Sequence, residues 1–103
     1  MFGWLQKKGK EKQIKNIHED LAELIEVSNI ADAYISENGN TSEKNMEKVV
    51  NAQKKLLFSF LGPLEIPEIE ALIENIKQQL HISGGAEMAI QHVIDTFKKD
   101  QGK

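Results

Sequence analysis

The sequence lacks both cysteine and arginine, and it contains only two prolines, one tryptophan and one tyrosine among 103 residues. Without cysteine there is no disulfide framework, thiolate zinc site, iron–sulfur cluster or cysteine nucleophile. We therefore expect a cytoplasmic protein, because a reducing compartment leaves such a chain unaffected. All thirteen basic residues are lysines, so contacts that need the bidentate fork of a guanidinium group are excluded.

Long apolar runs are also missing. Stretches such as Leu56-Leu57-Phe58 are short, and none approaches the roughly 20 residues that a membrane-spanning helix needs. At the start of the sequence, aromatic residues precede Lys7 and Lys8, which is the reverse of the order in a secretory signal. We expect neither a transmembrane helix nor a signal peptide.

Charge is unevenly distributed along the chain, whose formal net charge is −3. Residues 1–16 hold five lysines and one glutamate, whereas the stretch from His18 to Glu37 holds six acidic residues and no lysine. A chain of this length supports one hydrophobic core. We predict a basic and aromatic N-terminal arm over residues 1–10 and a single helical-bundle domain over residues 11–103.

Four segments show the three- and four-residue apolar spacing of amphipathic helices. The first is predicted from Glu11 to Ser36, with a heptad seam at Ile14, Ile17, Leu21, Leu24, Ser28, Ala31 and Ile35. The second begins after Thr41 or Ser42 as the N-cap and ends at Gly62-Pro63. The third starts near Pro67, and the fourth runs from about Ala86 to Lys99.

The predicted fold class is all-α, since no segment alternates as a half-buried strand does. Short connections favour antiparallel neighbours, so we predict an antiparallel up-down four-helix bundle with a long first helix. The seam of that first helix is longer than the other helices can cover, and an uncovered heptad seam favours a partner.

Residues for catalysis are sparse, and we expect no enzyme activity, no cofactor and no metal. His18, His81 and His92 do not fall in a spacing that places two metal ligands on one helical face. No serine lies in a nucleophile elbow. The acidic cluster of the first helix has the character of a solvated face rather than of a desolvated acid/base pair.

Ser83-Gly84-Gly85 before the fourth helix admits three interpretations: a helix–helix turn, an anion site at a helix start, or the turn of a helix-turn-helix. The turn is favoured, because the motif lacks the lysine of a P-loop. The following helix would bring Glu87 and Asp95 to the DNA phosphates with no lysine before Lys98. We expect no nucleic-acid partner.

The N-terminal arm combines apolar side chains with lysines. Phe2, Trp4 and Leu5 precede Lys7 and Lys8, an arrangement that allows weak, salt-sensitive contact with an anionic membrane surface. Docking of these apolar residues onto the same or another protein chain is the favoured hypothesis. The weak membrane-surface adaptor is retained as an alternative function.

The leading functional hypothesis is a small non-catalytic protein that acts through protein–protein association, as a homo-oligomer or with another protein. A second hypothesis is an immunity-type or inhibitor-type protein that binds one partner through its acidic first helix. In length and four-helix outline the chain resembles the small cytosolic bacteriocin immunity proteins, a resemblance of shape without a shared residue motif. The candidate interaction residues are Phe2, Trp4, Leu5, Glu19, Glu23, Glu26, Ile25 and Tyr34.

Overall fold

The computed structural model describes residues 3–101, with side chains from residue 9 onward. It contains four helices: α1 (Gly3–Asn38), α2 (Glu43–Ser59), α3 (Ile66–Gln79) and α4 (Gly84–Gln101). Residues 3–101 include no β-strand. The predicted all-α class is therefore confirmed.

The turns between the helices lie where the sequence predicts them. Gly39 has a φ of 77°, and the side chain of Ser42 caps α2 by accepting a hydrogen bond from the Asn45 backbone N–H at 3.4 Å. Pro67 occupies the first turn of α3, where its missing N–H costs nothing. Polar and glycine-containing segments thus connect α1 to α2 and α2 to α3 as expected, whereas Gly84 and Gly85, predicted in the turn before the fourth helix, form the first turn of α4.

Helix α1 begins earlier than predicted, at Gly3 rather than Glu11. Gly9 lies against the α2–α3 loop, where a Cβ would be 3.6 Å from Pro63 Cγ, and Lys10 Nζ is 3.5 Å from Glu68 Oε2. The Lys10–Glu68 ion pair favours the helical arrangement against the penalty of about 1 kcal/mol for an internal glycine. The boundary predicted at residue 10 falls inside one continuous helix.

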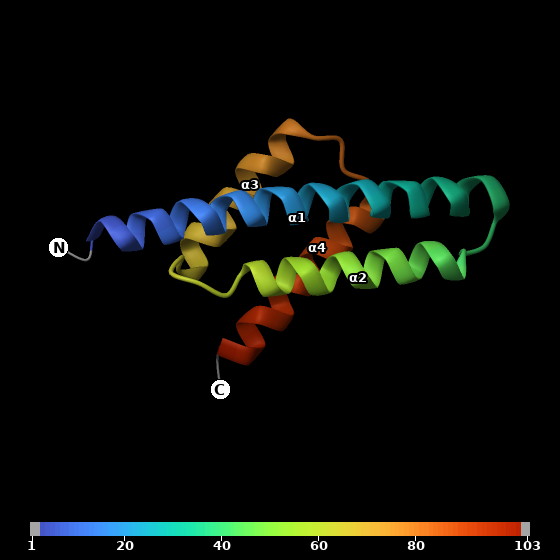
Figure 1. The fold of residues 1–103 in the computed structure, drawn as a ribbon. Helices are drawn as coiled ribbons and strands as arrows, with labels where there is room; N and C mark the ends of the chain where they lie inside the picture. Colours follow the sequence, from blue (N-terminus) through green and yellow to red (C-terminus); the bar gives the residue numbers. More distant parts are fainter. Residues whose placement is uncertain (1–2, 102–103) are drawn as a thin grey trace.

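The helices form an elongated molecule of 57 × 31 × 19 Å. Helices α1 and α2 lie side by side and run in opposite directions, whereas α3 and α4 cross this pair obliquely (Figure 1). Helices α3 and α4 are joined by two ion pairs, Lys77–Glu87 at 2.9 Å and Lys98–Glu70 at 3.2 Å. What the structure shows is four helices packed together, with α3 and α4 strongly tilted.

The core lies where all four helices meet. Its largest fully buried side chains are Phe60, Ile17, Leu21, Leu24, Leu56, Ile73 and Ile90. The rings of Phe60 and Phe97 meet edge to face with centroids 5.4 Å apart, a favoured aromatic geometry. The predicted seam of α1 is buried only in its middle, since Ile14 and Ile35 at its ends are 40% and 37% exposed.

A buried amide joins α1 to the loop between α2 and α3. Gln13 is 5% exposed, and its Nε2 donates hydrogen bonds of 3.0 Å to the carbonyl oxygens of Ser59 and Phe60. Its Oε1 accepts a 2.8 Å hydrogen bond from the Leu64 N–H. Gly62 in this loop has a φ of 156°, and a Cβ there would lie 2.7 Å from Gln13 Cδ. The close approach therefore requires glycine.

Two further side chains of α1 hold the loop between α3 and α4. Asn29 Nδ2 donates to the His81 carbonyl oxygen at 3.0 Å, and Asn29 Oδ1 accepts from the Ser83 N–H at 2.9 Å. Asp32 Oδ2 accepts from the Gly85 N–H at 2.8 Å. The start of α4 is therefore capped by a carboxylate of α1, which favours the helix–helix turn over an anion site at Ser83-Gly84-Gly85.

Candidate interaction surface

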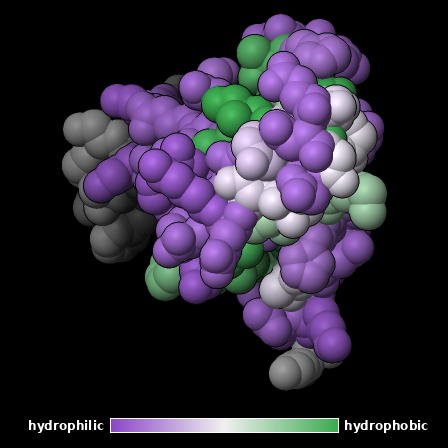
Figure 2. Space-filling view, turned by 90° about the vertical axis from the view of Figure 1, so that its right-hand side faces the viewer, coloured by the Kyte–Doolittle hydropathy of each residue, from purple (hydrophilic) through white to green (hydrophobic). Residues whose placement is uncertain are grey.

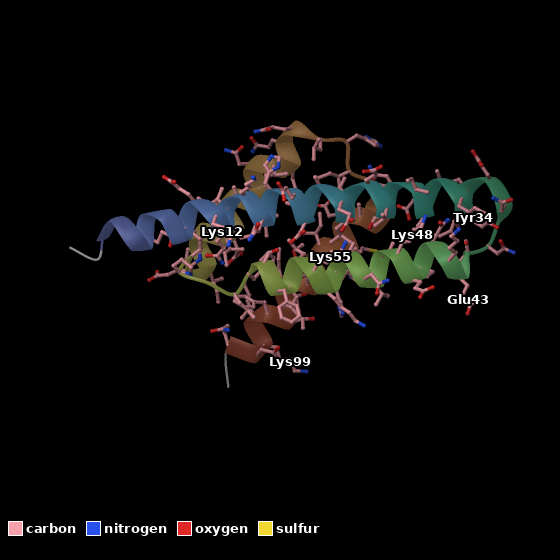
Figure 3. All side chains as sticks on the ribbon, in the orientation of Figure 1. Lys12, Tyr34, Glu43, Lys48, Lys55 and Lys99 are labelled. Atoms are coloured by element: carbon pink, nitrogen blue, oxygen red, sulfur yellow. The ribbon has the colours of Figure 1, made fainter. Side chains whose placement is uncertain are left out.

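One side of α1 faces solvent along most of the helix. Spacings of three, four and seven residues align exposed side chains that we call the outer stripe: Lys12, Lys15, Glu19, Glu26, Ile30 and Ala33. These spacings repeat the 3.6-residue period of the helix, so the six side chains share one face. In Figure 3, Lys12 lies towards the start of α1, and Tyr34, beside the stripe, lies towards its end.

The chemistry of the outer stripe changes in order along the helix. It is basic at Lys12 and Lys15, acidic at Glu19 and Glu26, and apolar at Ile30, which is 53% exposed. None of the four charged side chains forms an ion pair within the part of the chain whose side chains are described. Their charges are therefore directed to solvent or to a partner.

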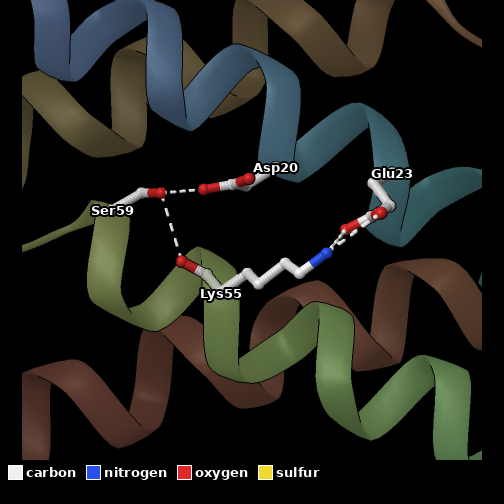
Figure 4. A network of polar contacts seen from close by, with 4 residues as sticks. All are labelled: Asp20, Glu23, Lys55 and Ser59. Atoms are coloured by element: carbon white, nitrogen blue, oxygen red, sulfur yellow. Dashed lines mark hydrogen bonds and ion pairs between the residues drawn. The ribbon is translucent and has the colours of Figure 1, made fainter.

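Glu23 differs from the other two predicted glutamates. It is half-buried, and Lys55 Nζ on α2 lies 3.1 Å from its Oε2 (Figure 4). One turn away, the Ser59 hydroxyl on α2 donates a hydrogen bond to the Asp20 carboxylate. These contacts connect α1 to α2, so the charge of Glu23 is already partnered within the chain.

The structure separates the predicted interaction residues. Glu19 and Glu26 are exposed, and Tyr34 is 37% exposed. Ile25 is only 3% exposed and belongs to the core, so its prediction as an interaction residue is wrong. Helices pack on more than one side of α1, and the apolar face of α1 is therefore wider than a heptad seam. Phe2 lies outside the described residues. Trp4 and Leu5 lie on α1, but their side chains are outside the described part.

Comparison with models of known protein families, with curated proteins and with solved structures finds no match to this chain. The surface is therefore interpreted from its own chemistry.

An apolar groove opens at the far end of α1 and α2, next to the start of α4. It encloses about 460 Å³ and is lined by side chains that include Ala31, Ile35, Met46, Val50 and Met88. Met46 and Val50 on α2 are 44% and 43% exposed. Seen towards this end of the molecule, hydrophobic side chains reach a mostly hydrophilic surface in several separate areas (Figure 2).

Ser28 also lines this groove. It is 3% exposed, and within the described residues its hydroxyl oxygen has no hydrogen-bond partner. A buried hydroxyl without a partner costs free energy, and Ser28 interrupts an otherwise apolar seam.

The pKa shifts among the described titratable groups favour charged forms. A hydrogen bond from the Glu65 backbone N–H lowers the pKa of the Glu68 carboxyl, and Lys10 lowers it further. Hydrogen bonding to Glu87 raises the pKa of the Lys77 amine. General acid/base catalysis near neutral pH needs shifts in the opposite directions, so these two groups serve as ion-pair partners rather than as an acid or a base.

The described residues carry neither a metal cluster nor a membrane-spanning helix. No three His, Asp or Glu side chains of residues 3–101 come together where they could hold a metal ion. None of the four helices combines the length and the apolarity required to cross a membrane.

Sequence reasoning missed four residues of the outer stripe, namely Lys12, Lys15, Ile30 and Ala33. The signal was present, because they continue the spacing that places Glu19 and Glu26 on one face. The prediction did not use it, because it followed the apolar seam and the acidic residues of this helix and not its opposite face. In the structure the lysines and glutamates lie on one exposed face of one helix.

Proposed function

We propose that the protein is non-catalytic and acts by binding another polypeptide through the outer stripe of α1. One observation carries the proposal: a solvent-facing side of a single helix bears Lys12, Lys15, Glu19 and Glu26 without ion-pair partners, next to exposed Ile30. Exposed aliphatic side chains beside ordered charges are typical of helix-mediated association.

The stripe offers both parts of a binding surface. Ile30 in the stripe and Tyr34 beside it supply apolar contact area, and the charged residues supply register and partner choice. We further propose that the protein acts in the cytoplasm, in keeping with a chain free of cysteine, and that its architecture is an up-down bundle in which α3 and α4 are tilted.

The proposal is tested by charge reversal on the stripe. Tagged wild-type protein and a Glu19→Lys/Glu26→Lys variant are expressed in the native cells, and stable partners are identified after crosslinking. We expect a defined partner that the wild type retains and the variant loses, and the purified pair should bind with an affinity that falls at least about tenfold in the variant.

A matched control carries the same change of charge elsewhere. Glu47 on α2 and Asp100 on α4 are exposed and lie outside the stripe, so Glu47→Lys/Asp100→Lys should retain every partner. Circular dichroism of both variants verifies that each keeps its helical fold. If all partners stayed bound to the Glu19→Lys/Glu26→Lys variant, the outer stripe would not be the binding surface.

A further inference from the structure

We infer that the partner of the outer stripe is a second copy of this chain, with the two α1 helices packed antiparallel about a two-fold axis near residue 17. This inference rests on the proposed function and names its partner. It follows from the order of charge along the stripe, because a face that runs from basic to acidic is complementary to itself when reversed.

The register follows from the residue numbers. An axis at residue 17 places position i of one helix opposite position 34 − i of the other. Lys15 then faces the second copy's Glu19, and Lys12 lies between its Glu19 and Glu26, each within about one helical turn. Two-fold symmetry produces each contact twice.

The same register extends to the start of α1, which is helical from Gly3. Position 8, a lysine, falls opposite Glu26, and positions 4 and 5, Trp and Leu, fall opposite the exposed Ile30. The length of α1 from position 4 to position 30 is about 39 Å at about 1.5 Å per residue.

The opposite orientation is excluded by charge. In a parallel pair in register, each lysine of the stripe faces the same lysine of the second copy, and each glutamate faces the same glutamate. Every charged contact is then repulsive. Only the antiparallel pair converts the charge segregation of the chain, five lysines before residue 16 and none from His18 to Glu37, into attraction.

Sedimentation equilibrium of the full-length chain tests the inference. The wild type should form a dimer of twice its 11.6 kDa mass, and the dimer should weaken several-fold as salt is raised. Each exposed ion pair changes the dissociation constant by roughly 1.5- to 5-fold. The Glu19→Lys/Glu26→Lys substitution replaces attraction by repulsion at both symmetry-related sites. We therefore expect the dissociation constant of the dimer to increase at least about tenfold.

The decisive experiment mixes two variants. The Glu19→Lys/Glu26→Lys chain has an all-basic stripe, and the Lys12→Glu/Lys15→Glu chain has an acidic one at the described positions. Each alone should be monomeric, and an equimolar mixture should form a 1:1 heterodimer. The Glu47→Lys/Asp100→Lys control should dimerise like the wild type. Failure of the mixture to associate, with both variants helical, would overturn the inference.

Orientation is tested separately, because the chain has no cysteine of its own. Antiparallel packing holds the two copies of position 30 about 39 Å apart, far beyond the roughly 7 Å limit for disulfide formation. Ile30→Cys should therefore form no intermolecular disulfide, whereas a mixture of Lys15→Cys and Glu19→Cys chains should form a mixed one. A disulfide-linked Ile30→Cys dimer would overturn the antiparallel arrangement.

Different outcomes would overturn the second copy as the partner and the outer stripe as the binding surface. A wild type that is monomeric at every concentration, while a different protein is bound and is lost on Glu19→Lys/Glu26→Lys substitution, overturns the second copy and leaves the proposed function intact. A dimer that both charge reversals leave unchanged overturns the outer stripe itself.

Discussion

The buried amide of Gln13 gives the sharpest test of the fold. Replacing it by leucine keeps the volume similar but removes one acceptor and two donor contacts. The Leu64 N–H loses its 2.8 Å bond, and the carbonyl oxygens of Ser59 and Phe60 lose theirs at 3.0 Å. A buried backbone group left without a partner costs about 1–3 kcal/mol.

The expected loss for Gln13→Leu is therefore about 3 kcal/mol, taking about 1 kcal/mol for each of the three groups. Domains of this size have a total unfolding free energy of about 5–15 kcal/mol, so the change is large. With a urea m-value of about 1.5 kcal/mol/M, the midpoint should fall by about 2 M. Urea titration followed by circular dichroism measures this shift.

The neighbouring residue provides the control. A heptad seam places Ile14 in the core and leaves Gln13 at the surface, whereas the structure has Ile14 at 40% and Gln13 at 5% exposed. Ile14→Gln should thus cost less than about 1 kcal/mol. If Gln13→Leu were neutral or stabilising while Ile14→Gln was severely destabilising, the hydrogen-bonded arrangement described above would be refuted.

Three more predictions concern single positions. Gly62 has a φ of 156°, and a Cβ there would lie 2.7 Å from Gln13 Cδ, so Gly62→Ala should lower the unfolding free energy by about 2 kcal/mol. The loss should be smaller in a Gln13→Ala background, and thermal unfolding of the two single variants and the double variant measures this coupling. Ser28→Ala removes the buried hydroxyl that has no partner in the described residues and should stabilise the protein by up to about 1 kcal/mol, raising its urea midpoint. The pKa of Lys77 is raised above its ordinary value of 10.5 by Glu87 and Glu74, so its ion pairs stabilise the fold fully below pH 10.5 and are lost as pH rises through the folded-state pKa; Lys77→Met should show a smaller alkaline loss of stability than the wild type in urea titrations across that range.

The sequence predicts the helices well because helix signals are local. Apolar spacing, the cap at Ser42, Pro67 in a first turn and the glycine turns each depend on a few neighbouring residues. The start of α1 could not be predicted in this way, because Gly9 and Lys10 lie next to Pro63 and Glu68, more than 50 positions away in the sequence. Local propensity favoured a break that tertiary packing removes.

The candidate surface was only partly predictable. Glu19 and Glu26 were identified from spacing, but Ile25 was placed at the surface because the pattern alone does not reveal how many helices pack on α1. Gln13 had no signal at all: an amide becomes a core residue only when distant backbone groups converge on it. Polar groups in a core are the positions that apolar periodicity cannot find.

Gln13 and Asn29 on α1 together fix the distance that α3 has to span. The first amide holds the chain just before α3 and the second holds it just after, and they stand 16 positions apart, about 24 Å of helix. Inserting one residue between them would turn one amide by about 100° and detach its loop. Inserting seven residues would restore the face but lengthen the span by about 10 Å, so α3 would have to lengthen too. The lengths of these two helices can change only together.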